Sequence, residues 1–464
     1  MWKRARWILA RLNCARSKVS RISSPAARIP VAAIVATGIL ACGPWPQVAR
    51  SEHAIPTAIA EYVGRPDDVF AWEIKGKNAL PRGRVWEVEL TSQKWQGIVW
   101  KHALPVFEPK DVRYPRHVLL FITGGSIGGR PSKENLQMGL QLAELAHARV
   151  AMLHQVPNQP LLDNRKEDDL ISETWLRFLD TGDVTWVLQL PMVKSAVRAM
   201  DAVQAMAKTE WNEPVEGFVV TGASKRGWTT WLTAVADKRP IAIAPMVIDM
   251  LNLRPQMKYQ LETWGQYSEQ IGDYTRKGLV REGELNEREA FLLRLVDPYT
   301  YRAQLTLPKL LLHGANDPYW TVDAARLYWN DLVGPKYLHE VPNGGHGLEG
   351  GRPKALATLA AFFRHVAGNR PWPELTWTHA ESDKEYSLQV SSSIEPKAAR
   401  VWIAKAPSKD FRQSKWRSEP MPRREAAYLA VVPKPAEGHV AFFGELEFDD
   451  QGAPFSLCTL VQRH

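Results

Sequence analysis

The chain has 464 residues, of which 45% are hydrophobic and 23% charged, so it is long enough to bury one large core and a second small one. Its formal net charge is +9, but eight of the 59 basic residues lie within the first 28 positions, and the other 51 almost balance the 50 acidic residues. These eight are Lys3, Arg4, Arg6, Arg11, Arg16, Lys18, Arg21 and Arg28. The excess charge belongs to the N-terminus, so we expect no nucleic-acid partner.

The cysteine content is low. Cys14 and Cys42 lie in the N-terminal leader, which leaves Cys458 as the only cysteine deep in the chain. No internal disulfide is expected, and a metal site built from several cysteines is excluded. The sequence also contains no phosphate-binding loop and no zinc signature, so no cofactor and no metal are expected.

The first 42 residues have the order of an export signal: a basic region, the largely apolar stretch 31–41, and then small residues. A membrane-spanning helix needs about 20 apolar residues, so this stretch is too short to be one. The run ILAC at 39–42 resembles a bacterial lipoprotein cleavage box, in which Cys42 would become the lipidated, membrane-attached first residue. Plain cleavage near Ala49 or Ala54 is the alternative. Either way we expect an exported protein, periplasmic, anchored to the envelope or secreted.

Strand-like and helix-like patterns alternate from about 55 to 368. Apolar and polar residues alternate at 84–90 and 95–104, which predicts an antiparallel hairpin at the start of the domain. Apolar runs typical of buried strands follow at 117–122, 148–153, 216–221, 241–248, 309–313 and 336–341, with helical spacing between them at Trp186, Leu190, Val193, Val197 and Met200. The pattern predicts an α/β domain with a mostly parallel sheet, helices on both faces, and ligand chemistry at the carboxyl ends of the strands.

A long insertion at about 252–304 interrupts this alternation, and it is rich in aromatic and acidic residues. We expect it to form a helical cap over the substrate site. Trp264 and Tyr267 are its candidate substrate-binding residues. The alternative is that they belong to the core of the cap, with the acidic residues on a solvated face.

The composition changes after 368–373, where the run GNRPWP indicates a stiff linker. Short strand-like runs separated by polar or proline-rich turns follow at 386–390, 400–404, 428–432, 440–448 and 455–461. They predict a small β-sandwich-like domain over 374–464. It carries no catalytic constellation, so its expected roles are binding, orientation or shielding.

A serine in the run 217–228, GFVVTGASKRGW, is the candidate nucleophile. The run reads as a buried strand, a glycine turn and a helix, with Ser224 at the apex. On such an elbow the hydroxyl stands above the sheet edge, and the N–H of the next residue points at the substrate oxygen. The second glycine, Gly227, comes one residue later than in the Gly-x-Ser-x-Gly motif. A simple helix N-cap is the alternative role for Ser224.

Candidates for the base and the orienting acid follow in the chain order that serine elbows use, Ser, Asp, His. Asp317 comes just after the run 309–313, and His346 lies in a glycine-rich loop after 336–341. Taken alone, Asp317 could simply start a turn, because it precedes a proline, and His346 could be a loop residue without a partner. Their joint occurrence after Ser224 in this order favours a catalytic triad. Asp249, just past the run 241–248, is the alternative acid.

An oxyanion site needs backbone N–H donors. The N–H of Lys225 is one candidate, and the loop after 116–122 offers a second, because Gly124 and Gly125 allow positive φ and close backbone approach; an ordinary turn is the alternative. The cations Lys225 and Arg226 oppose the dipole at a helix N-terminus. We therefore expect a buried acidic partner for them, with Asp249 as one candidate, or an anionic group on the substrate.

Four runs together resemble the PhoPQ-activated pathogenicity-related proteins of the PqaA type: GASKRGWTTW at 222–231, IDMLN at 248–252, HGAND at 313–317 and PNGGH at 342–346. The likeness extends from about residue 62 to the C-terminus. It implies an α/β-hydrolase with a β-sandwich-like tail, of the kind found in bacterial envelopes and in some secreted eukaryotic proteins. The His-Gly-x-x-Asp segment also resembles dipeptidyl-peptidase-like serine peptidases, but the chain has no room for their propeller domain.

These observations predict a serine hydrolase that cleaves an ester or an amide of a small-molecule or peptide substrate through an acyl-enzyme. Two alternatives remain open. One is a non-catalytic secreted binding or virulence-related protein that keeps the same fold. The other is a carbohydrate esterase, which the 19 tryptophans favour only in a general way.

Overall fold

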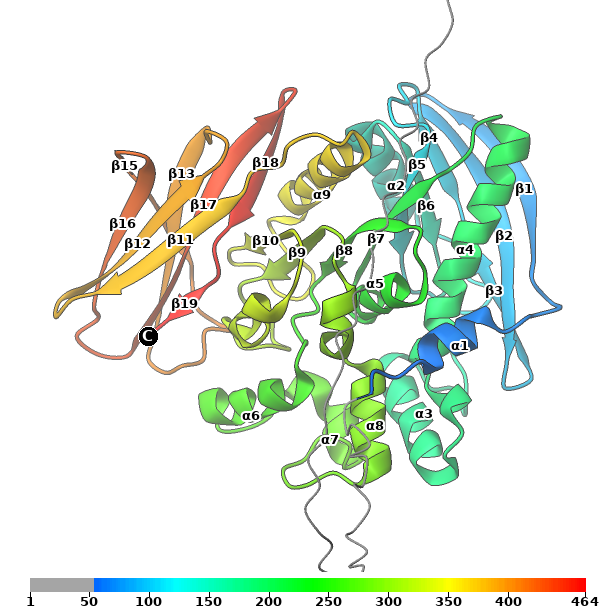
Figure 1. The fold of residues 1–464 in the computed structure, drawn as a ribbon, viewed down its shortest axis with the longest axis horizontal. Coiled ribbons are helices and arrows are strands. Elements are labelled where there is room, and N and C mark those ends of the chain that lie inside the picture. Colours follow the sequence, from blue (N-terminus) through cyan, green and yellow to red (C-terminus); the bar gives the residue numbers. More distant parts are fainter. Residues whose placement is uncertain (1–53) are drawn as a thin grey trace, which may run out of the picture. The chain divides into compact units, whose positions relative to one another are not determined.

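The largest sheet has ten strands in the order β1-β2-β4-β6-β5-β7-β8-β9-β10, with β3 paired to β2. In the computed structural model, which describes residues 54–464, this sheet belongs to one compact unit, Ala54–His464 (Figure 1). The predicted export signal, Cys42 and a cleavage site at Ala49 lie outside the described residues. None of the helices in the described part of the chain has both the length and the hydropathy that a membrane crossing needs.

Two kinds of pairing divide the large sheet. The strands are β1 (Ala71–Leu80), β2 (Gly83–Trp95), β3 (Ile98–Ala103), β4 (Val106–Pro109), β5 (His117–Ile122), β6 (Arg149–Leu153), β7 (Gly217–Ala223), β8 (Pro240–Met246), β9 (Lys309–Gly314) and β10 (Lys336–Val341). Strands β1 to β4 pair antiparallel, and β4 joins β6 in the same way. Strands β5 to β10 pair parallel. The sheet is therefore mostly parallel, as the apolar runs predict.

The parallel strands are continuous apolar runs because both of their faces are buried. In β5, Leu119 packs in one hydrophobic core and the next residue, Leu120, in another. Since successive side chains of a strand point to opposite faces, the two cores lie on the two sides of the sheet.

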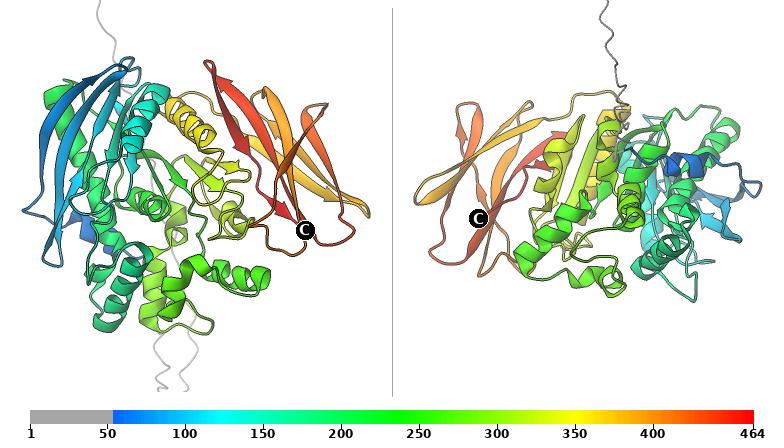
Figure 2. Two further views of the ribbon diagram at one scale, coloured as in Figure 1. Left: turned by 180° about the vertical axis from the view of Figure 1, so that it is seen from behind. Right: turned by 60° about the horizontal axis from the view of Figure 1, so that its bottom comes forward.

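Helices cover both faces (Figure 2). On the Leu119 side, α2 (Lys133–Ala146) and α9 (Arg352–Ala367) pack together. On the Leu120 side lie α1 (Ala58–Gly64), α3 (Glu167–Thr181), α4 (Gln189–Glu210) and α5 (Lys225–Ala236). The helix predicted from Trp186 to Met200 begins later in the structure. Trp186 belongs to a separate 3-10 turn, η1 (Val184–Trp186), that precedes α4.

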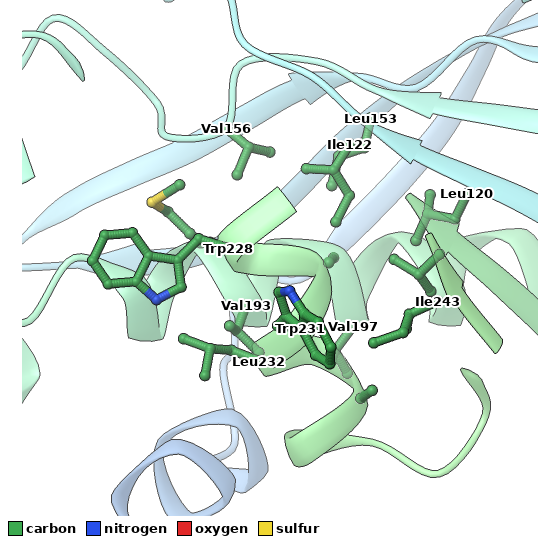
Figure 3. Packing of buried hydrophobic residues seen from close by; sticks show 14 of the residues in the cluster. Leu120, Ile122, Leu153, Val156, Val193, Val197, Trp228, Trp231, Leu232 and Ile243 are labelled. Carbon is green, nitrogen blue, oxygen red and sulfur yellow. The ribbon is translucent and has the colours of Figure 1, made fainter. Parts of the chain in front are cut away.

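Helix α5, which follows the serine elbow, is almost completely enclosed by the sheet and the neighbouring helices. Figure 3 shows Trp228 and Trp231 of α5 among Leu120, Ile122 and Ile243 of the sheet and Val193 and Val197 of α4. Trp231 is fully buried and Trp228 is 6% exposed. This packing fixes the helix that begins at Ser224 against both the sheet and its neighbour.

The insertion between β8 and β9 contains only helices and turns. Its elements are α6 (Leu253–Trp264), η2 (Glu269–Ile271), α7 (Gly272–Arg276), α8 (Glu287–Val296) and η3 (Pro298–Gln304). A capping box starts α8, with the Asn286 side chain accepting from the Glu289 N–H and the Glu289 side chain accepting from the Asn286 N–H. Two further turns, η4 (Ala324–Leu327) and η5 (Trp329–Asp331), lie between β9 and β10.

The C-terminal region consists of two antiparallel sheets. One contains β11 (Leu375–Glu381), β12 (Glu385–Ser392), β15 (Arg423–Arg424) and β16 (Ala427–Pro433), and the other β13 (Ala398–Ala406), β14 (Arg417–Pro420), β17 (His439–Asp450), β18 (Ala453–Cys458) and β19 (Gln462–Arg463). Leu388 of the first sheet and Phe442 of the second share one core, so the sheets form a sandwich. That core also contains Phe363 of α9, which joins the sandwich to the large sheet.

The strand order identifies the architecture. In the large sheet β5 lies between β6 and β7, and the parallel strands then continue in chain order from β7 to β10. Together with a serine at the β7–α5 turn, this is the α/β-hydrolase fold. The fold class predicted from the sequence is confirmed, including the helical cap insertion and the β-sandwich-like C-terminal region.

Replacing Trp231 should test the packing beneath the elbow. We expect Trp231→Ala to lower the free energy of unfolding by about 3–5 kcal/mol, since it removes a fully buried aromatic side chain. Trp231→Phe keeps most of the buried apolar surface and should lose clearly less. Urea unfolding followed by circular dichroism would measure both, and equal losses would contradict the packing described here.

Candidate active site

Ser224 stands in a strained turn between β7 and α5. Its φ of 58° and ψ of −124° lie in a region of backbone conformation that residues other than glycine rarely adopt. Its N–H donates to the Met246 carbonyl at the end of β8 (2.9 Å), and its own carbonyl accepts from the Trp228 N–H (3.0 Å). The backbone is held on both sides, which is the geometry of a nucleophile elbow.

The two glycines around Ser224 permit this close packing. A Cβ on Gly222 would lie 2.7 Å from the Arg226 carbonyl oxygen. A Cβ on Gly227 would lie 2.7 Å from Ile248 Cγ2 and 2.9 Å from the Met246 oxygen. The later position of the second glycine therefore still lets helix α5 pass close to strand β8.

His346 lies between Ser224 and Asp317. Its Nε2 is 2.8 Å from Ser224 Oγ, and its Nδ1 is 2.8 Å from Asp317 Oδ2. With Nδ1–H donating to the carboxylate, Nε2 is the acceptor for the serine hydroxyl. The three residues come from loops after β7, β9 and β10, which meet because parallel strands end at one edge of the sheet.

Tyr319, which no sequence motif singles out, supports this arrangement. Its backbone N–H donates to Asp317 Oδ1 at 2.9 Å, and its ring packs against the His346 imidazole with centroids 4.2 Å apart. The Asp317 N–H donates to the Gly314 carbonyl at 3.0 Å. Both oxygens of the buried carboxylate are thus engaged, which fixes its orientation toward His346.

Asp249, the alternative acid, has other partners. It accepts a hydrogen bond from the Tyr328 hydroxyl, and its Oδ2 lies 3.6 Å from Nδ1 of the buried His313. Burial raises the pKa of Asp249 to about 6. Among the hydrogen bonds of residues 54–464, none joins Asp249 to His346. The structure therefore pairs His346 with Asp317 and not with Asp249.

The cations at the start of α5 pair with two acidic residues at the start of α3. The Arg226 guanidinium makes two hydrogen bonds to Glu167, of 2.8 and 2.7 Å, and Lys225 Nζ lies 2.9 Å from Asp168 Oδ2. Asp249, named as one candidate partner, does not have this role, because it is turned toward Tyr328 and His313. The signal in the sequence was the acidic run at 167–169, which forms the first turn of helix α3 in the structure.

These charges change the acidity of Glu167. Burial alone would raise its pKa, but the hydrogen bonds from Arg226 and the positive charges of Arg226 and Lys225 outweigh burial and lower the pKa to about 2. Glu167 is therefore ionised at neutral pH. The structural partner that we expected for the two cations exists within the chain.

The candidate oxyanion donors lie around the elbow. The Lys225 N–H is the first of helix α5, and such N–H groups have no partner inside the helix. Ile122 at the end of β5 is paired with Gly222, so the turn that contains Gly124 and Gly125 follows directly beside the elbow. Gly125 has a φ of +134°, and a Cβ on Gly124 would lie 2.5 Å from Arg226 Nη2. Gly124 thus makes room for Arg226, and the oxyanion role of this turn stays a prediction.

A cavity of about 230 Å³ opens beside Ser224 and His346. Its wall is mainly apolar and comes from α3, α5 and the cap, with Trp175, Trp228, Met257, Leu261, Tyr274 and Leu293 among the lining residues. Asp168 and Lys225, paired with each other, are also part of the wall.

Of the two predicted substrate-binding residues, Tyr267 lines the cavity and Trp264 does not. Trp264 is the last residue of α6, where the Arg412 guanidinium lies 4.2 Å from its ring centroid. The ring of Trp264 thus packs against the C-terminal region and outside this cavity, so the cavity lends no support to its predicted role. Within residues 54–464, no group of three His, Cys, Asp or Glu side chains is arranged to hold a metal ion.

A comparison with models of protein families identifies the family of this chain. A family model described as "PhoPQ-activated pathogenicity-related protein" matches residues 59–412. The chain belongs to this family. One relative is the Autocrine proliferation repressor protein A of Dictyostelium discoideum. It is 33% identical over 429 residues, which cover 84% of this chain and 86% of the relative.

Solved structures similar to this chain are more distant. Acetyl xylan esterase 1 from Thermoanaerobacterium sp. JW/SL YS485 has a TM-score of 0.45 and 15% identity, over 68% of this chain and 95% of that chain. The Pyrococcus horikoshii acylaminoacyl peptidase has a TM-score of 0.41 and 15% identity, over 63% of this chain and 49% of that chain. At these TM-scores the fold assignment rests on the strand order and the elbow.

The low pKa of Glu167 predicts a pH-dependent stability. A carboxyl whose folded pKa is depressed from 4.5 to about 2 contributes stability that is complete above pH 4.5 and is lost as the pH falls toward 2. We expect Glu167→Gln to be less stable than the wild type at pH 7, with a difference that shrinks steadily from pH 4.5 to pH 3. Urea unfolding across this pH range measures the difference.

Glu262→Gln is the matched control, because its exposed ion pair with Lys258 (3.6 Å) should contribute little at any pH. A Glu167→Gln deficit that is the same at pH 7 and pH 3 would contradict the assignment of Glu167 as the ionised partner of Arg226.

Proposed function

We propose that this chain is a serine hydrolase that cleaves an ester or an amide through an acyl-enzyme on Ser224. The observation that carries the proposal is the continuous contact from Ser224 Oγ through His346 to Asp317, at 2.8 Å in each step, beside a cavity. A strained elbow, a base within hydrogen-bonding distance and an acid that orients it are the components that nucleophilic serine catalysis requires.

In the proposed mechanism, His346 Nε2 accepts the Ser224 proton while Oγ forms a bond to the substrate carbonyl carbon. Asp317 keeps the proton of His346 on Nδ1 and stabilises the imidazolium. The leaving group departs with the proton from Nε2, and the acyl group remains on Oγ. Water, deprotonated by the same Nε2, then attacks the acyl carbon. The bond from that carbon to Oγ breaks, Nε2 returns the proton to Oγ, and the acid is released. The Lys225 N–H and the Gly124–Gly125 turn are the proposed oxyanion donors, and loss of one donor raises such a barrier by about 3–4 kcal/mol.

The mainly apolar cavity supports a substrate with an apolar acyl group or an apolar leaving group. Of the charged residues in its wall, Asp168 and Lys225 neutralise each other, whereas Arg254, Lys258, Arg281 and Glu282 add further charges. The apolar part of the wall therefore carries the proposal of a small ester, or of a peptide with an apolar side chain.

We also propose that the protein is exported, to the periplasm, the cell envelope or the medium. The support is the sequence order of a basic region, the apolar stretch 31–41 and Cys42. Attachment to a membrane through a lipidated Cys42 belongs to this proposal, with plain signal cleavage as the alternative.

A second candidate function is a secreted signal that does not require catalysis. The specific observation in its favour is the name of the Dictyostelium discoideum relative, which describes an autocrine repressor of proliferation. A fold of this kind does not fix the function. Covalent titration of Ser224 separates the two candidates.

We expect a fluorophosphonate probe to label the wild-type protein with one probe per chain and to label neither Ser224→Ala nor His346→Ala. Asp317→Asn should keep the fold and lower kcat on a chromogenic ester by about 10⁴-fold, because His346 loses its orienting acid. Mass spectrometry of the labelled peptide measures the first result. Ser391→Ala, in β12 of the sandwich, is a matched control that should label normally. A folded wild type that takes up no probe would favour the signalling candidate.

The cavity predicts a preference for longer acyl groups. In a series of p-nitrophenyl esters, kcat/KM should rise from acetate to hexanoate by up to about fourfold for each buried methylene, which corresponds to about 0.8 kcal/mol. Met257→Trp narrows the cavity and should shift the preference toward acetate. Met138→Trp, on α2 at the other face of the sheet, should leave the preference unchanged. A flat acyl-chain profile in the wild type would argue against an acyl site in this cavity.

A further inference from the structure

The C-terminal sandwich contacts the two loops that carry Asp317 and His346. The contacts come from its segment 407–416, between β13 and β14. The Asn316 side-chain amide donates to the carbonyl oxygens of Phe411, Arg412 and Ser414, at 3.1, 3.2 and 2.8 Å. Asn316 is the residue directly before the candidate acid. Two amide hydrogens thus serve three acceptors, and the turn of Asp317 is bonded to a segment about 95 residues later in the chain.

The loop of His346 is held by the same segment. Asn343 Nδ2 donates to the Trp416 carbonyl at 3.1 Å, and Asn343 Oδ1 accepts from the Trp416 N–H at 2.8 Å. The two loops also bond to each other, because the Asn316 N–H donates to the Gly344 carbonyl at 2.9 Å. The acid loop, the base loop and the segment 407–416 therefore form one hydrogen-bonded unit.

The segment itself is firmly anchored. Phe411 and Trp416 are 2% and 3% exposed, and they share a small hydrophobic core with Ala315, just before the acid turn. Arg412 reaches in the other direction, to Glu269 at 3.0 Å and over the ring of Trp264 in the cap. A rigid segment of the sandwich thus connects both triad loops with the cap.

We propose that residues 407–416 are a positioning segment for the triad, acting through Asn316 and Asn343. The proposal rests on the proposed hydrolase function for its kinetic consequence. Asn316 and Asn343 do not touch the reacting atoms; they hold the backbone that sets the distance from Asp317 to His346 and from His346 to Ser224. Small displacements of catalytic groups lower turnover strongly, so these bonds should act on kcat more than on substrate binding.

The remaining contacts of the sandwich offer a matched control. Lys354 of α9 pairs with Glu445 and Glu447 of β17, at 2.5 and 3.2 Å, and neither pair includes a residue of segment 407–416 or of the turns that carry Asp317 and His346. Loss of that contact weakens the interface without touching the Asp317 or His346 loop. It separates a general loss of stability from a loss of positioning.

The test compares Asn316→Ala, Asn343→Gly and Lys354→Ala in the full chain. Glycine is the substitute at position 343 because Asn343 has a φ of 60°, which alanine would strain. At a temperature well below every melting midpoint, we expect both asparagine variants to lose about 10- to 100-fold in kcat, with KM changed less than about twofold. Lys354→Ala should lower the melting midpoint and keep the wild-type kcat.

Hydrogen exchange followed by mass spectrometry gives a readout that does not need activity. Peptides that cover 314–320 and 342–348 should exchange faster in the asparagine variants and at the wild-type rate in Lys354→Ala. Unchanged exchange in these peptides overturns the proposal, and so does an equal loss of kcat in all three variants. If the wild type neither labels with fluorophosphonate nor hydrolyses esters, the proposed function fails, and the exchange data alone decide the positioning proposal.

Discussion

The backbone conformation of Ser224 is the constraint on which the surrounding structure depends. A residue other than glycine at φ 58° and ψ −124° is strained and persists only where its neighbours fix it. Here strand β8 accepts the Ser224 N–H, and Gly222 and Gly227 let strand and helix approach to distances that any side chain would prevent. The buried tryptophans of α5 keep the helix in that place. The position of the hydroxyl is thus a product of packing on three sides.

The charges around the elbow follow from the same constraint. A helix that starts this close to the sheet buries Lys225 and Arg226, which are both 8% exposed. A buried cation is tolerable only beside an anion, and α3 supplies Glu167 and Asp168. Asp168 also accepts from the Tyr274 hydroxyl at 2.9 Å, so the charge pairs connect the elbow with helix α7 of the cap. Both cations are thus neutralised within the chain, and the proposed oxyanion donors are backbone N–H groups and not these side chains.

Much of this arrangement could be predicted from the sequence, and the reason is the parallel sheet. Strands buried on both faces are continuous apolar runs, and their carboxyl ends share one edge, so the order Ser224, Asp317, His346 already implied proximity. Contacts between distant segments could not be predicted in this way. The pairing of Arg226 with Glu167 spans 59 residues, and aromatic content alone could not tell that Arg412 covers Trp264. Local patterns specify elements, whereas such partners depend on how the elements pack.

The sequence indicates that 368–373 is a linker between domains, whereas in the structure this segment is packed against the sandwich. Proline and glycine mark it as a boundary, yet Trp372 within it is only 9% exposed and stacks on Phe455 of the sandwich, with ring centroids 4.6 Å apart. The match to the family, from 59 to 412, crosses this linker. A chain divided at such a point would expose a core that neither half can close by itself. The sandwich and the hydrolase fold share this core and should therefore melt in a single cooperative transition.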